Sequence, residues 1–230
     1  MCNGARNSCV KQQQKTAGAS RFDFGSLSHD YDRWYATPPG RANDLAQKKD
    51  VLQLLPLATT TGQRLLDVGC GTGHWSGFFA TLGYAVVGID ISPEMISVAR
   101  RQRRPELAFQ VADAGALPFK DASFAIAAAM ATIEFTVSPP CVLKEMARCV
   151  VRKGRILIGT LNGSAPLNRQ RVEEGREPYA SAQLYSAEEL CALLSPFGRL
   201  RMVASIPGER NDSDLRINPD APFIVAEIQR

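Results

Sequence analysis

The sequence predicts an α/β fold with an open, mostly parallel sheet and helices on both of its faces. First, short apolar runs typical of buried strands alternate with segments whose apolar residues recur at helical spacing. Second, a glycine-rich loop joins the strand at residues 65–68 to the helix that follows it. Third, three successive strands end close to an aspartate, and parallel strands bring their carboxyl ends to one edge of a sheet.

Length and charge favour one globular domain over residues 22–230. The chain has 230 residues, 45% of them hydrophobic, which suffices for a single full core. Residues 1–21 are polar, carry four basic side chains and no acidic one, and are expected to form a disordered basic tail. Basic and acidic side chains balance in the remainder. We therefore expect no nucleic-acid partner, because phosphate backbones attract an excess of positive charge.

Cysteine usage and hydropathy predict a cytoplasmic protein without a metal site. The six cysteines form no Cys-x-x-Cys pair, and the chain has only two histidines. Residues 1–20 contain no apolar core of the kind that a signal peptide has, and no apolar run in the sequence approaches the length of a membrane span. We expect neither disulfides nor a membrane span, and the sequence does not indicate an oligomeric state.

An aromatic cluster marks the segment before the first strand. Tyr31, Trp34 and Tyr35 precede a proline-rich turn, and leucines recur on one face of a helix at about residues 41–55. We expect an N-terminal helical lid over about residues 28–57. Its rings either cover a bound ligand or pack the segment on the sheet, and both interpretations remain open.

The glycine loop identifies the kind of ligand. Gly69, Gly71 and Gly73 follow the first strand, and a helix begins directly after them, so backbone N–H groups and a helix N-terminus face the ligand. A dinucleotide fingerprint requires Gly-x-Gly-x-x-Gly, but its third glycine position holds His74. The spacing therefore argues against a pyrophosphate ligand.

The next two strands also end in acidic residues. The run at residues 84–90 closes on Asp90, and Ser92 with Pro93 then begins a helix as N-cap and first helical residue. The run at residues 107–112 is followed by Asp113. At this edge of a parallel sheet, a carboxylate such as that of Asp90 accepts hydrogen bonds from both hydroxyls of a ribose.

The second half of the chain continues the alternation. We expect strands at residues 124–130 and 155–159, a helix from residue 139 to about 150, and a helix behind the capping box of Ser186 and Glu189. Residues 200–206 and 222–228 are expected to pair as a hairpin. The connection at residues 161–184 is unusually long, which is typical of binding loops.

This order of motifs resembles the class I S-adenosylmethionine-dependent methyltransferases. The resemblance depends on Asp67 with its glycine loop, on residues 88–92, on residues 113–119 and on the fourth strand, and covers about residues 22–200. Within the class, it points to the small-molecule branch that includes quinone-biosynthesis methyltransferases. It implies a Rossmann-like sheet of seven strands with the last one antiparallel. It also implies S-adenosyl-L-methionine as cofactor and S-adenosyl-L-homocysteine as product.

The resemblance assigns roles to individual residues. Gly69 and Gly71 would contact the methionine part of the cofactor, Asp90 its ribose and Met95 the adenine face. Asp113 and the N–H of Ala114 would bind the adenine edge. The remaining residues of the predicted cofactor site are Tyr31 and Trp34 in the lid, and Asp67, Cys70, Ile91 and Met130 at the strand ends.

The fourth strand departs from the family pattern. Many relatives carry a histidine near its end, whereas this chain has Met130 followed by a stretch with Glu134. Glu134 is the substitute candidate for a general base or an acceptor-binding acid, and a capping or solvated role is equally open. The predicted reaction is in-line methyl transfer to a small-molecule acceptor, with residues 161–184 on the acceptor side.

Three other functions are weighed against this one. A nicotinamide oxidoreductase could use the same kind of sheet, but the early third glycine and the additional Asp113 argue against it. A non-catalytic S-adenosylmethionine-binding protein would carry the same motifs. Methylation of RNA or protein is the third alternative, and the neutral domain argues against RNA.

Overall fold

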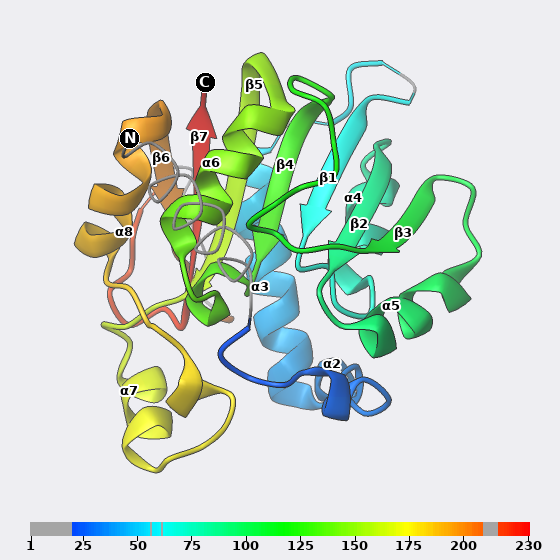
Figure 1. The fold of residues 1–230 in the computed structure, drawn as a ribbon. Helices are drawn as coiled ribbons and strands as arrows, with labels where there is room; N and C mark the ends of the chain where they lie inside the picture. Colours follow the sequence, from blue (N-terminus) through cyan, green and yellow to red (C-terminus); the bar gives the residue numbers. More distant parts are fainter. Residues whose placement is uncertain (1–19, 56, 61, 209–215) are drawn as a thin grey trace, which may run out of the picture.

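A computed structural model describes residues 20–55, 57–60, 62–208 and 216–230. Its centre is a seven-stranded sheet in the order β3-β2-β1-β4-β5-β7-β6 (Figure 1). The strands are β1 (Arg64–Val68), β2 (Ala85–Asp90), β3 (Leu107–Val111), β4 (Phe124–Met130), β5 (Val150–Leu161), β6 (Arg199–Val203) and β7 (Phe223–Gln229). The first five strands pair in parallel, and β7 pairs antiparallel with β5 and β6. The predicted fold class and the terminal hairpin are confirmed.

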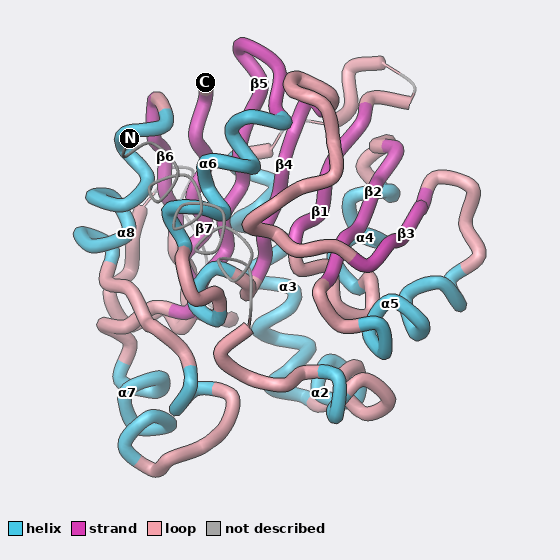
Figure 2. Tube along the Cα trace, in the orientation of Figure 1, coloured by secondary structure: helices cyan, strands magenta, loops and turns pink. Residues whose placement is uncertain are grey.

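Helices cover both faces of this sheet (Figure 2). The helices are α2 (Arg33–Ala36), α3 (Pro38–Leu54), α4 (His74–Thr81), α5 (Pro93–Ala99), α6 (Pro139–Cys149), α7 (Pro166–Glu173) and α8 (Ala187–Leu194). Of these, α2 and α7 lie beyond the ends of the strands, not on a face of the sheet (Figure 1). Short 3-10 turns lie at Gly25–Leu27, Arg100–Gln102, Ile133–Phe135, Tyr179–Ser181 and Ser195–Phe197. Because the crossover helices lie on the faces, the loops at the carboxyl ends of the parallel strands are left to form a site.

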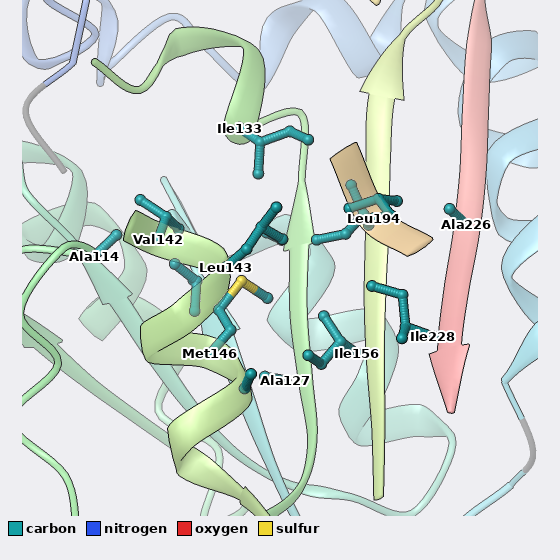
Figure 3. Packing of buried hydrophobic residues seen from close by; sticks show 14 of the residues in the cluster. Ala114, Ala127, Ile133, Val142, Leu143, Met146, Ile156, Leu194, Ala226 and Ile228 are labelled. Atoms are coloured by element: carbon teal, nitrogen blue, oxygen red, sulfur yellow. The ribbon is translucent and has the colours of Figure 1, made fainter. Parts of the chain in front are cut away.

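Two apolar layers fix the helices to the sheet. On one face, Leu143 and Met146 of α6 pack with Leu194 of α8 against buried strand residues such as Ile156 (Figure 3). On the other face, α3 and α4 contribute Val51, Leu54, Trp75 and Phe79 to a second cluster. The central strands β1, β4 and β7 are mostly buried on both faces, which is why they appear in the sequence as apolar runs.

The connection at residues 161–184 contains a helix that the sequence pattern does not predict. In α7, Asn168 is the only buried side chain, so this helix has no apolar stripe that could reveal its period. The amide of Asn168 instead donates hydrogen bonds to the carbonyls of Asn162 and Pro222, at 2.9 and 2.7 Å. Polar bonding to the backbone, rather than apolar burial, holds this helix in place.

The N-terminal tail falls mostly outside the described residues, which begin at Ser20. Ser20 forms an isolated bridge with Thr136, and the backbone N–H of Arg21 donates to the carbonyl of Phe135 at 2.7 Å. The last residues of the predicted tail therefore lie against the loop that follows β4. In the described part of the chain, no helix combines the length and apolarity needed to cross a bilayer.

Candidate cofactor site

A cavity of about 450 Å³ lies at the carboxyl ends of β1, β2 and β4. It is lined by the loops after these strands and by residues of the N-terminal segment. From the predicted cofactor set, it is lined by Tyr31, Gly69, Cys70, Gly71, Asp90, Ile91, Met95, Ala114 and Met130. The sheet edge that the sequence indicates is thus hollowed, and it collects most of the predicted residues.

The loop after β1 depends on its glycines. Gly69 has φ of 69°, and a Cβ atom there would lie 2.3 Å from the side chain of Thr132. Gly71 has φ of 52°, and its N–H donates to Asp90 Oδ2 at 2.9 Å. Residues with a Cβ atom rarely adopt this backbone conformation. Glycine therefore lets the loop turn sharply and keeps its backbone close to the cavity.

Asp90 is the acidic residue that reaches the cavity from the end of β2. Its Oδ1 accepts a hydrogen bond from the N–H of Ser92 at 2.9 Å, while Oδ2 holds Gly71. Burial raises the pKa of Asp90, and the backbone hydrogen bonds oppose that rise. The carboxylate thus ties the glycine loop to the start of α5, and its remaining lone pairs suit ligand hydroxyls.

The other two strand-end acids lie elsewhere. Asp67 is buried, 1% exposed, and accepts a 2.6 Å hydrogen bond from the hydroxyl of Ser76. Burial raises the pKa of Asp67 to about 7. Asp113 accepts from the N–H of Gly115 at 2.7 Å, and neither acid lines the cavity. Asp67 fastens β1 to α4, and Asp113 shapes the turn that presents Ala114.

The end of β4 forms another wall. Met130, Ala131 and Thr132 line the cavity, and the Thr132 hydroxyl donates to the carbonyl of Val68 at 3.2 Å. Glu134 does not line the cavity and is fully buried behind this wall. Its Oε1 accepts from the N–H of Leu161 at 3.1 Å, and burial raises its pKa to about 7. The buried carboxyl joins the loop after β4 to the end of β5.

Only part of the aromatic cluster in the N-terminal segment lines the cavity. Tyr31 and Tyr35 line the cavity, whereas Trp34 is 37% exposed and does not. The Tyr35 ring stacks on His74 with centroids 3.7 Å apart, and His74 Nε2 lies 2.7 Å from a carboxylate oxygen of Asp44. The predicted cofactor set lacks both Tyr35 and His74, although Tyr35 belongs to the aromatic cluster whose rings were expected to cover a ligand or pack on the sheet.

Residues 20–24 were also missed as part of the site. They line the cavity together with Phe135. The rings of Phe22 and Phe24, and those of Phe24 and Phe135, pack edge to face with centroids 4.9 Å apart. None of residues 161–184 lines the cavity. Among the described residues, no group of three or more His, Cys, Asp or Glu side chains could hold a metal ion.

Comparisons with known proteins agree with this geometry. Residues 66–158 match the model of a methyltransferase domain family. The chain is 31% identical over 158 residues to the demethylmenaquinone methyltransferase of Lactococcus lactis, covering 65% of this chain and 62% of that protein. It is 32% identical over 177 residues to an uncharacterised protein of Mycobacterium tuberculosis, covering 76% of this chain but 58% of that protein.

A solved structure from Thermotoga maritima shares the fold over nearly its whole length. That protein is described as a SAM-dependent methyltransferase and possible histamine N-methyltransferase. The TM-score is 0.68 at 26% sequence identity, and the match covers 90% of this chain and 97% of the other. The Lactococcus lactis relative confirms the resemblance to the branch that includes quinone-biosynthesis methyltransferases. The family match runs from β1 to β5 and includes the loops after β1, β2 and β4 that line the cavity. The chain is thus similar to class I S-adenosylmethionine-dependent methyltransferases, in its fold and over residues 66–158.

Proposed function

We propose that this chain transfers a methyl group from S-adenosyl-L-methionine to a small-molecule acceptor. One observation carries the proposal: a single cavity of about 450 Å³ contains both the glycine loop with Asp90 and a separate wall of aromatic rings. Pockets for small molecules typically measure about 300–1,000 Å³. The cavity is thus large enough for a ligand, and its two walls differ in chemistry.

The polar wall fits the cofactor. Gly69 and Gly71 bring bare backbone close, Asp90 supplies a carboxylate for ribose hydroxyls, and Met95 with Ala114 supplies apolar contact for adenine. Bound there, the cofactor would supply a methyl group on a positively charged sulfur, which an acceptor nucleophile displaces in line. The chain's own residues would hold both molecules and exclude water.

The aromatic wall favours an apolar, planar acceptor. Phe22, Phe24 and Phe135 present ring faces and edges, which pack well on another ring. The relative named demethylmenaquinone methyltransferase acts, by its name, on a molecule that contains such a ring. We therefore propose a small ring-bearing acceptor at residues 20–24 and Phe135.

Residues 161–184 would support this wall from behind. The N–H of Gln183 donates to the backbone carbonyl of Glu134 at 2.8 Å, and Arg21 donates to the side chain of Gln183 at 3.2 Å. This segment thus joins the loop after β4 to residues 20–24. In the same way, the predicted lid contributes Tyr31 and Tyr35 to the cavity.

Glu134 stays a candidate base without contact to the cavity. A general base needs hydrogen-bond reach to the proton it removes, and the Glu134 carboxyl lies behind the wall instead. A pKa of about 7 would suit proton transfer near neutral pH. Methyl transfer from a sulfonium needs no base when the acceptor is already unprotonated. The proposal therefore depends on alignment of the two molecules, and Glu134 is not required for it.

Calorimetric titration with S-adenosyl-L-homocysteine tests the cofactor half. We expect Asp90→Ala to weaken binding about tenfold or more, because charge-assisted hydrogen bonds contribute about 1.5–3 kcal/mol each. Asp220→Ala is the matched control, since Asp220 is exposed on the turn before β7. Equal affinity in the wild type and Asp90→Ala would contradict the assignment, as would tighter binding of NAD than of S-adenosyl-L-homocysteine.

Transfer of a radiolabelled methyl group tests the acceptor half. Small ring-bearing molecules, total RNA and unfolded protein would be offered separately to the wild-type chain and to Asp90→Ala. We expect label in the small-molecule fraction, and less of it with the variant. Label only in RNA or protein would favour the alternative substrates. Cofactor binding without any transfer would favour a non-catalytic binding protein.

A further inference from the structure

A second cavity lies at the end of the sheet opposite the proposed cofactor cavity. It measures about 200 Å³ and is lined by Arg155, Arg199, Arg201, Glu227 and Gln229. We call it the arginine cavity. Arg155 and Arg199 both pair with Gln229 in the strand register, and Arg201 pairs with Glu227. Side chains two positions apart on a strand share a face, so all five lie on one face of β5, β7 and β6.

A buried carboxylate organises two of the three arginines. Glu227 is 1% exposed, and each of its oxygens accepts a hydrogen bond from a different guanidinium, that of Arg155 or that of Arg201. Arg201 also donates to the carbonyl of Leu54, the last residue of α3, at 3.0 Å. These contacts fix two guanidinium groups in place at the cavity wall.

The third arginine, Arg199, does not bind Glu227. The exposed side chain of Arg199 makes no hydrogen bond and no ion pair with any residue in the described part of the chain, although its backbone pairs with Gln229. The cavity therefore holds three positive side chains against one negative side chain, an excess of two charges. Burial, and then the neighbouring charges of Arg155 and Arg199, lower the pKa of Arg201. Such like-charge crowding is relieved when an anion binds.

The geometry suits a doubly charged oxyanion. Guanidinium groups present donors in a planar fork that matches phosphate oxygens, and phosphate carries a charge of about −1.5 to −2 at neutral pH. We propose that the arginine cavity binds phosphate, either free or as the phosphate group of a larger molecule. The site is separate from the methyl-transfer cavity and does not depend on the proposed reaction.

Calorimetry with inorganic phosphate, at an ionic strength held constant with sodium chloride, tests the proposal. We expect saturable binding of one phosphate per chain, and at least tenfold weaker binding in Arg199→Gln, because this guanidinium has no partner among the described residues that would compete for it. Arg101→Gln is the matched control, since Arg101 is exposed on the turn after α5. It should bind phosphate as tightly as the wild type.

Competition then identifies the source of the phosphate. Glycerol 3-phosphate that displaces inorganic phosphate would show that a phosphate group of a larger molecule fits, and failure to displace would show that free phosphate is the ligand. Phosphate binding that is absent in the wild type, or equal in the wild type and Arg199→Gln, would overturn the proposal. Repeating the titration with bound S-adenosyl-L-homocysteine keeps this result distinct from failure of the cofactor site.

Discussion

At the residue scale, the wall of the proposed cofactor cavity contains an alanine with strained backbone. Ala131 has φ of 51°, and its N–H donates to the carbonyl of Gly159 at 2.8 Å. A left-handed conformation costs a residue with a Cβ atom roughly 1–2 kcal/mol. Strained backbone persists where surrounding structure holds it, often at functional sites. Here it sets the direction of the chain between Met130 and Thr132, both of which line the cavity.

We predict that Ala131→Gly raises the free energy of unfolding and weakens cofactor binding. Glycine removes the Cβ strain but loses more backbone entropy on folding, so the net gain should be at most about 1 kcal/mol. A less rigid wall should lower the affinity for S-adenosyl-L-homocysteine severalfold. Urea denaturation and calorimetry measure the two effects.

Ala122→Gly is the matched control for this prediction. Ala122 has φ of 52° and is exposed in the turn before β4, outside the residues that line the cavity. It should gain similar stability and leave cofactor affinity unchanged. A loss of affinity in Ala122→Gly as well, or in neither variant, would show that strain at Ala131 does not shape the site.

At the element scale, two short helices begin at serine N-caps, but only one of them begins at the cavity. Ser92 accepts a hydrogen bond from the N–H of Met95 at 3.1 Å and begins α5 at the cavity. Ser186 accepts from the N–H of Glu189 at 3.2 Å, and the Glu189 side chain accepts in return from the Ser186 N–H. This capping box begins α8, away from the cavity.

We predict that Ser92→Ala and Ser186→Ala each lower the free energy of unfolding by about 1 kcal/mol, the usual cost of a lost N-cap. Their effects on S-adenosyl-L-homocysteine should differ. Ser92→Ala should weaken binding severalfold because the start of α5 carries Met95 into the cavity. Calorimetry measures the affinities. Equal affinities in the two variants would show that the N-cap of α5 does not affect cofactor binding, which would refute the prediction.

At the scale of the whole molecule, two buried acids make folding depend on pH. Burial raises the pKa of Asp67 from 3.8 and that of Glu134 from 4.5, each to about 7. At a pH between the unfolded-state pKa and the folded-state pKa of each acid, the folded chain keeps a proton that the unfolded chain has already lost. Stability therefore falls as the pH rises from about 4 to about 7 and then levels off.

Asp67→Asn should remove one of these two contributions. We expect the wild type to lose about 2 kcal/mol more than the variant between pH 5 and pH 7, since each unit of pKa shift corresponds to about 1.4 kcal/mol. The amide oxygen can still accept the Ser76 hydrogen bond. Urea unfolding at several pH values measures this difference, with exposed Asp220→Asn as control. Parallel pH profiles for the wild type and Asp67→Asn would show that Asp67 titrates normally.

Local patterns in the sequence determined the elements and the kind of site. Apolar periodicity, the glycine spacing and the N-cap at Ser92 depend on neighbouring residues, so they predicted the sheet, the loop after β1 and the place of Asp90. In contrast, α7 was hidden because polar hydrogen bonds, rather than an apolar stripe, hold it.

Tertiary structure alone decided which residues meet. Of the three strand-end acids, Asp90 lines the cavity, while Asp67 is buried beneath α4 and Asp113 bonds its own turn. Residues 20–24 contact the loop after β4, which lies more than a hundred positions further along the chain. Packing across that distance depends on side-chain direction and register, which no local pattern contains. By itself, the sequence determined a Rossmann-like sheet with a glycine loop after its first strand, whereas long-range packing decided which residues line the cavity.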